Sequence, residues 1–146
     1  METSSAYIYR LPDTLFQSVN SGSIAFYDIT ILEAEITGDG HVGAFVSYAE
    51  AQSSVSLKNC HVVESNLVST GASAGGLLGY TNAAHVLIRD CSVQKKPLQG
   101  ESLKMIGSIN GGETVIADAK IDALYGSLSL GETGMLNLVN TELATV

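Results

Sequence analysis

The chain has 146 residues, of which 45% are apolar and 15% charged, and it carries a formal charge of −8 at pH 7. This length predicts one domain, and the apolar fraction is ample for a core. The negative charge argues against nucleic acid as a partner, because nucleic acid requires a basic surface, and no apolar run approaches the roughly 18 residues of a membrane span. Residues 1–5 also lack the charged start and apolar middle of a signal peptide.

Residues 1–22 precede the repeat described below and are predicted to form an N-terminal cap. Residues 7–9, with two Tyr around an Ile, predict an edge strand. Residues 13–20 predict a short helix that Asp13 would cap and Gly22 would end. A cap is expected there because the terminal repeat of a stacked fold exposes core side chains and strand edges.

Residues 23–146 repeat one motif. It reads Val55-Ser-Leu57-Lys-Asn59-Cys60-His-Val62 and recurs 31 residues later as Val86-Leu-Ile88-Arg-Asp90-Cys91-Ser-Val93. Self-similarity at such a period predicts repeats that stack to bury their apolar faces. The five copies align on one Asn/Asp column, called the ladder here: Asp28, Asn59, Asp90, Asp118 and Asn140.

Two apolar columns flank the ladder. Two residues before it stand Phe26, Leu57, Ile88, Ile116 and Leu138. Three residues after it stand Ile31, Val62, Val93, Ile121 and Leu143. Strand side chains alternate with period 2, so this spacing means that the inward phase slips by one residue at the ladder. A bend or bulge produces such a slip, and Asn and Asp tolerate the left-handed backbone that a bend demands.

A second segment follows each copy, in which residues 43–48 match Gly75-Gly76-Leu77-Leu78-Gly79-Tyr80 and residues 105–108 match more loosely. Eight residues after the ladder, a third short strand is predicted at Ile36, Leu67 and Leu98. The sequence therefore predicts an all-β fold. The expected architecture is a right-handed parallel β-helix of about five coils, residues 23–146, behind the short helical cap, with a rise of about 4.8 Å per coil.

The residues Asn59-Cys60 with Val62, followed by residues 75–80, resemble the GLUG-type repeat, whose core is Gly-Leu-hydrophobic-Gly. That family is similar to β-helical stalk regions of bacterial cell-surface proteins, including adhesin-like proteins and the non-catalytic part of immunoglobulin-A-cleaving metallopeptidases. The resemblance spans roughly Ile24 to Leu143; Ser47 replaces the second Gly in the first coil, and the last two coils lack the Gly-Gly-Leu core. It implies a cell-surface or secreted location and supplies no catalytic residue.

The two cysteines and three histidines are candidates for chemistry. Cys60 and Cys91 occupy one inward column, either as packed thiols or as a disulfide or metal pair. Parallel stacked side chains do not point at each other and structural zinc takes four ligands, so we predict reduced, buried thiols. His41, His61 and His85 fall at unrelated positions of the repeat, so no metal site is predicted from them.

The ladder carboxylates have three interpretations. Asp90 and Asp118 should be neighbours, and paired acids can perform general acid/base catalysis or bind calcium. Alternatively, the ladder caps corner amides, which Asn does equally well. Because Asn cannot act as an acid, its interchange with Asp favours a structural role. No catalytic residue, metal ligand or cofactor is therefore predicted.

Together with these features, the resemblance implies a non-catalytic structural or interaction module of a bacterial surface or secreted protein, with adhesion as one use and a host glycan or protein as its partner. The alternative is a carbohydrate-active β-helix, similar to a polysaccharide lyase or esterase, whose site the sequence does not locate. The chain stops three residues after Leu143, which leaves no C-terminal cap. End-to-end self-association through the last coil is therefore expected.

Overall fold

The structure of the protein is a computed structural model, and it describes residues 6–95, 105–121 and 129–143. Throughout these ranges the chain is all β and forms no helix. The strands are β1 (Ala6–Tyr9), β2 (Phe16–Tyr27), β3 (Ile29–Leu32), β4 (Glu35–Gly38), β5 (Val42–Gly43), β6 (Val46–Lys58), β7 (His61–Ser69), β8 (Ala74–Gly75), β9 (Leu78–Thr81), β10 (His85–Arg89), β11 (Ser92–Lys95), β12 (Ile106–Ala117), β13 (Lys120–Ile121), β14 (Ser129–Val139) and β15 (Glu142–Leu143).

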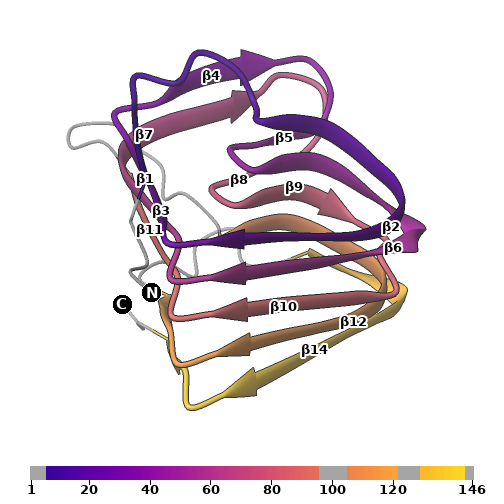
Figure 1. The fold of residues 1–146 in the computed structure, drawn as a ribbon. Helices are drawn as coiled ribbons and strands as arrows, with labels where there is room; N and C mark the ends of the chain where they lie inside the picture. Colours follow the sequence, from indigo (N-terminus) through magenta and orange to yellow (C-terminus); the bar gives the residue numbers. More distant parts are fainter. Residues whose placement is uncertain (1–5, 96–104, 122–128, 144–146) are drawn as a thin grey trace.

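The longest strands stack on one face of the molecule (Figure 1). In the order β2, β6, β10, β12 and β14, each strand is the parallel neighbour of the next. The residues two before the ladder are in register across all of them: Phe26, Leu57, Ile88, Ile116 and Leu138. The predicted alignment of the five copies is therefore confirmed, including the last two, which follow at shorter intervals.

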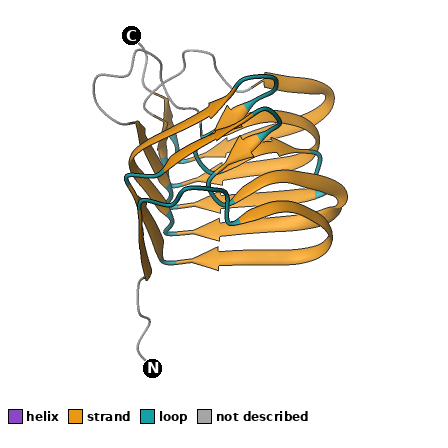
Figure 2. Ribbon diagram, turned by 90° about the horizontal axis from the view of Figure 1, so that it is seen from above, coloured by secondary structure: helices purple, strands orange, loops and turns teal. Residues whose placement is uncertain are grey.

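A second group of strands begins just after the ladder. In the order β1, β3, β7 and β11, neighbours are again parallel, and β13 pairs in parallel with β15. The register joins Ile8, Ile31, Val62 and Val93. Seen from above, these shorter strands lie on one side of the stack while the longer strands wrap around the other (Figure 2). Each turn of the chain through both groups is called a tier below.

The third short strand is also present. β4 pairs in parallel with the second half of β7, and this register places Ile36 opposite Leu67 as predicted. Leu98 lies outside the described residues.

Four strands form a closed circuit of parallel pairings, because β6 and β12 each pair with both β9 and β10. The circuit arises because β6 and β12 turn a corner. The start of β6 pairs with β9 through Val46 and Leu78, and its end pairs with β10 through Leu57 and Ile88. β9 and β10 are thus consecutive strands of one tier, which lies between the tiers of β6 and β12.

All five ladder residues adopt the left-handed backbone conformation and separate two strands, as the phase slip predicted. Their φ angles are 57° at Asp28, 53° at Asn59, 54° at Asp90, 52° at Asp118 and 46° at Asn140. A second column with positive φ comprises Arg10, Glu33 and Glu64. Arg and Glu do not favour this conformation, so residue type did not reveal the second column.

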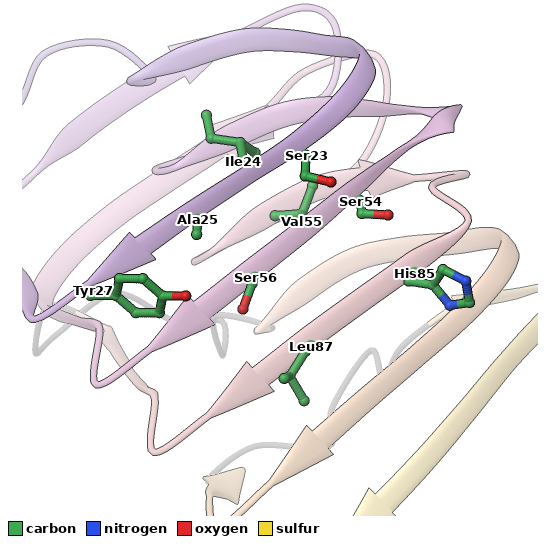
Figure 3. A pocket seen from close by; sticks show the side chains of 9 residues that line it. All are labelled: Ser23, Ile24, Ala25, Tyr27, Ser54, Val55, Ser56, His85 and Leu87. Carbon is green, nitrogen blue, oxygen red and sulfur yellow. The ribbon is translucent and has the colours of Figure 1, made fainter.

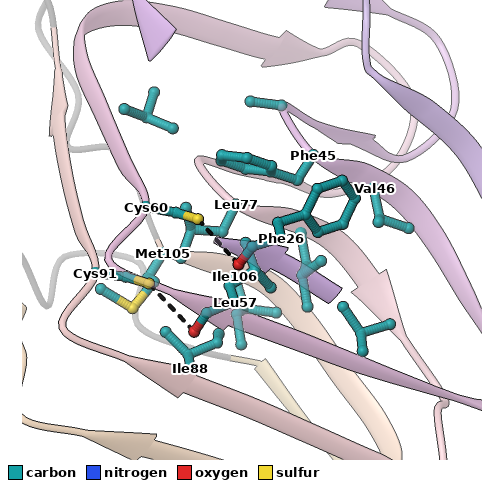
Figure 4. Close-up of a cluster of buried hydrophobic side chains, with 14 of the residues drawn as sticks. Phe26, Phe45, Val46, Leu57, Cys60, Leu77, Ile88, Cys91, Met105 and Ile106 are labelled. Atoms are coloured by element: carbon teal, nitrogen blue, oxygen red, sulfur yellow. Dashed lines mark hydrogen bonds between the residues drawn. The ribbon is translucent and has the colours of Figure 1, made fainter. Parts of the chain in front are cut away.

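The core fills the space between the strand groups. Leu57, Ile88 and Ile116 are fully buried, and burying a side chain of this size contributes roughly 1.5–3 kcal/mol relative to exposure. Phe26 and Phe45 pack edge to face there, with their ring centroids 5.1 Å apart (Figure 4). The inward columns of the repeat therefore form one continuous core along the stack.

The predicted N-terminal helix is absent. Residues 10–15 are irregular, and Thr14 N–H donates to the Asp13 carboxylate, before β2 starts at Phe16 and pairs with β6. An eight-residue helix is marginal by itself, whereas β6 offers the same backbone a complete set of parallel partners. β2 runs across residue 22, where the sequence suggested a boundary between a cap, residues 1–22, and the repeats, residues 23–146.

The glycine-containing segment aligns as the sequence predicted. Its registered pairs are Gly43 with Gly75, Val46 with Leu78, Tyr48 with Tyr80, and Leu78 with Ile106. At Gly75, an added Cβ would collide with the Leu78 carbonyl oxygen and with the backbone nitrogen of Gly107 in the next tier. The close approach of two backbones therefore requires glycine at this position.

Candidate functional site

The ladder side chains form hydrogen bonds between tiers. Asn59 Nδ2 donates to Asp28 Oδ1, and Asn140 Nδ2 donates to Asp118 Oδ1, both at 2.8 Å. The ladder backbone also bonds between tiers but in the opposite direction, since the Asp90 N–H donates to the Ala117 carbonyl of the next tier at 3.1 Å. The structure thus brings the predicted residues together as one column.

Asn59 extends this network to a histidine. Asn59 Oδ1 lies 2.9 Å from His61 Nε2, which donates to it, and His61 Nδ1 lies 2.7 Å from the Ser92 hydroxyl. Within the described ranges, no ladder side chain accepts a hydrogen bond from a backbone amide. The expectation that the ladder caps corner amides is therefore wrong, because its side chains instead join neighbouring tiers.

The two neighbouring carboxylates of the ladder, Asp90 and Asp118, differ in their hydrogen bonds, which within the described part of the chain the structure gives only for Asp118. Asp118 accepts from Arg89 Nε at 3.2 Å through Oδ2 and from Asn140 through Oδ1, so both of its oxygens are engaged. The ion pair is partly exposed and contributes little stability. Among the residues that the structure describes, no group of three His, Cys, Asp or Glu side chains could hold a metal ion. The column therefore has the geometry of a structural element.

The two cysteines are free and buried, as predicted. The Cys60 thiol donates to the Phe26 carbonyl at 3.4 Å, and the Cys91 thiol donates to the Leu57 carbonyl at 3.5 Å (Figure 4). The neighbouring Cys60 thiol, together with burial, raises the pKa of Cys91. Both groups thus behave as small core side chains.

The histidines occupy separate surroundings, in agreement with their positions in the repeat. The His41 ring stacks on Tyr80, with centroids 4.4 Å apart, and burial lowers the pKa of His41. His85 Nδ1 lies 4.0 Å from a carboxylate oxygen of Glu113 on an exposed part of β10 and β12. His61 belongs to the ladder network described above.

A shallow groove of about 360 Å³ crosses the outer face of β2, β6 and β10 (Figure 3). Small side chains such as Ala25 and Ser56 lie along it, and the exposed side chains of Tyr27, Leu87 and His85 also line it. The hydroxyls of Ser23, Ser54 and Ser56 supply most of its polar groups. The groove therefore offers apolar contact and few directional hydrogen bonds.

A second depression, called the polar cleft here, lies where β2, β6 and β9 reach a corner, and its volume is about 410 Å³. The side chains that line it belong to three neighbouring tiers, and three of the six are amides: Asn20, Tyr48, Glu50, Ala51, Gln52 and Asn82. This cleft has more hydrogen-bonding side chains than the apolar groove, and they lie beside the aromatic ring of Tyr48. It is the strongest candidate for a binding site in the described part of the chain.

The polar cleft was not predicted from the sequence, although one signal was present. Tyr48 and Tyr80 are 32 residues apart, whereas Leu57 and Ile88 are 31 apart. The tier of β6 therefore contains one extra residue between these positions. An insertion at a corner of a regular stack is a place to look for function, because it interrupts pairing without disturbing the core.

Comparison of the chain with protein-family models, with curated proteins and with solved structures finds no match. In the residues that the structure describes, there is also no helix of the length and apolarity that a membrane crossing needs.

Proposed function

We propose that the chain is a non-catalytic structural and interaction module of a bacterial surface or secreted protein. The observation that carries this proposal is the use of the ladder. Of the two side chains with the greatest catalytic potential, Asp118 accepts hydrogen bonds from Arg89 and Asn140 of the neighbouring tiers, and Asp90 lies in the same left-handed column. Such a column stabilises a stack and presents no converging acid and base.

The architecture we propose is a right-handed parallel β-helix of about five coils with GLUG-type repeats. It is supported by the parallel pairing of every neighbouring strand and by the in-register columns of the long strands. The tight contact at Gly75 gives a physical reason for the glycine at which the resemblance is strongest. A surface or secreted location follows from that resemblance, because β-helical stalks display repeats outside the cell.

A carbohydrate-active β-helix is the second candidate, and the polar cleft is the observation that favours it. A lyase or esterase needs acidic and basic side chains that converge on one site. Glu50 is the one charged side chain among the described residues that line the cleft. This composition supports holding a ligand more than cleaving it.

Incubation with a panel of polysaccharides and esters distinguishes the two candidates. The module proposal predicts no product above a buffer blank. Turnover that is lost in Asp90→Asn, Asp118→Asn or Glu50→Gln would instead establish the enzyme. As a separate test of location, antibodies against the chain should label intact producing cells, and labelling only after permeabilisation would contradict surface display.

We further propose end-to-end self-association through β14. Leu138 is 38% exposed, whereas its equivalents in the four preceding tiers are at most 6% exposed. Val139 and Met135 on the same strand are also exposed, and Phe16 is exposed on β2 at the opposite end of the stack. Parallel edge strands at the two ends would allow β2 of a second copy to continue the pairing of β14.

Light scattering over a range of protein concentrations tests this association. We expect the average molecular mass to increase with protein concentration. Leu138→Lys should abolish the increase, because association would bury the new charge between β14 and β2 of the second copy. A monomer at all concentrations would refute the proposal.

A further inference from the structure

We propose that the polar cleft binds an uncharged carbohydrate. This inference rests on the proposed role as an interaction module and names the ligand class and the site. Four polar side chains converge on the cleft from neighbouring tiers: Asn20, Glu50, Gln52 and Asn82. None of the four has a hydrogen bond or ion pair to another described residue, so their hydrogen-bonding capacity is available to a ligand.

The extra residue of β6 builds the cleft. On the β2 side, the register passes from Val19–Ala49 to Ser21–Gln52, so two residues of β6 face the single residue Asn20. On the β9 side, the Asn82 N–H donates to the Ala49 carbonyl at 2.8 Å and holds Asn82 beside the same corner. The β6 corner therefore has an amide side chain in the tier on either side of it, and its ribbon juts out there (Figure 1).

The β6 corner is itself held in place. The Ser53 hydroxyl donates to the Glu50 carbonyl at 2.7 Å, which closes the turn that carries Glu50, Ala51 and Gln52. Ser53 is 1% exposed. Its buried anchor fixes the backbone beneath the exposed side chains, so the cleft is formed before any ligand arrives.

Tyr48 supplies an aromatic wall. Its ring stacks on Tyr80 with an interplanar angle of 13° and a centroid separation of 4.9 Å, and Tyr80 stacks on His41. These contacts cover one face of the Tyr48 ring. In the tier on the other side the registered residue is Ser18, which has no ring to stack on Tyr48, and Tyr48 lines the cleft. The stack also fixes the ring orientation.

This combination of groups suits a sugar. Side-chain amides donate and accept at once, as the vicinal hydroxyls of a pyranose require, and an aromatic ring packs against the apolar face of the sugar ring. Glu50 can accept from two hydroxyls. The volume of about 410 Å³ falls in the usual range of ligand sites, roughly 300–1,000 Å³.

Other ligand classes fit less well. Glu50 is the one charged side chain that lines the cleft, and with the net charge of −8 it disfavours anionic ligands such as sulfated glycans. A calcium ion takes six to eight oxygen ligands, more than one carboxylate and three amides ordinarily supply. A peptide anchored by apolar side chains would fit the groove of Figure 3 better than this polar surface.

The test is binding of the purified chain to an array of neutral glucose-, galactose- and N-acetylglucosamine-based oligosaccharides, with their sulfated forms as a comparison. We expect binding to at least one neutral series and weaker binding to its sulfated form. Gln52→Ala with Asn82→Ala should weaken the binding at least tenfold. The exposed amide of Gln94 on β11 provides the matched control, because Gln94→Ala removes an equivalent group outside both the cleft and the proposed association edge.

Tyr48→Ala should also abolish binding, but this change removes part of an aromatic stack. Tyr48→Phe is its control, because it keeps the ring and should retain binding.

Absence of binding to every neutral series, or binding that the double variant leaves unchanged, would overturn the carbohydrate site. Neither result would contradict the non-catalytic module, because the incubation with polysaccharides and esters tests that proposal separately. Binding accompanied by product release would confirm the site and refute the module.

Discussion

At the scale of the residue, the left-handed conformation at the ladder explains why Asn and Asp recur there. Asn59 has a φ of 53° and makes hydrogen bonds to Asp28 in one tier and to His61 in its own. The side chain and the backbone therefore contribute to the bend separately. Substitutions at Asn59 can measure the side-chain and backbone contributions separately.

Asn59→Leu should lower the free energy of unfolding by roughly 1–3 kcal/mol, because it removes the hydrogen bonds and strains the backbone. Asn59→Gly removes the same bonds but suits the positive φ, so its loss should be smaller. Urea unfolding measures both. Equal stability of Asn59→Leu and the wild type would show that the ladder does not hold the bends.

A buried hydroxyl gives a position where a substitution should raise the stability of the protein. Thr114 is fully buried in the column of Val55 and Val86, and its Oγ1 has no hydrogen-bond partner in the described structure. Thr114→Val should therefore stabilise the protein by about 1 kcal/mol, since it removes an unpaired polar group. Thr81→Val is the control, and it should destabilise because Thr81 Oγ1 accepts from the Ala83 N–H at 3.0 Å. A loss of stability in Thr114→Val would contradict this account.

At the scale of the element, the turn between β8 and β9 depends on close contact between backbones. The alignment of Gly43 with Gly75 was predictable because both start the same short motif.

The predicted helix of residues 13–20 is the element that was wrong. Its apolar residues suited a helix face locally, but pairing along β6 also buries Val19 and satisfies the backbone. Tertiary pairing thus overrode the local pattern.

Gly75→Ala should destabilise the protein by about 1–3 kcal/mol, because the new Cβ would overlap backbone atoms of its own turn and of the next tier. Gly40→Ala is the matched control: no atom lies within 4 Å of a Cβ at that position, and its effect should be close to zero. Thermal unfolding followed by circular dichroism measures both. A similar melting temperature for the two variants would rule out the backbone contact as the reason for Gly75.

At the scale of the whole molecule, the repeat was sufficient to predict the parallel stack and its bends. Each tier repeats the same inward columns, so a period read from Asn59 and Asp90 also fixes the register of the strands. The polar cleft was not predictable in this way. It joins Asn20, Asn82 and the β6 corner, which occupy different positions of the repeat, and an extra residue in β6 brings them together. Regular features follow from periodicity, whereas this site follows from a departure from it.

The parallel stack is the central claim, and backbone nuclear Overhauser contacts between neighbouring tiers test it most directly. In a uniformly labelled sample, we predict contacts between α and amide protons of parallel strands that connect the residues around Leu57 with those around Ile88, and the residues around Ile88 with those around Ile116. Close pairs of α protons across these strands, which antiparallel pairing produces, or a series of sequential amide contacts typical of helix, would contradict the stack.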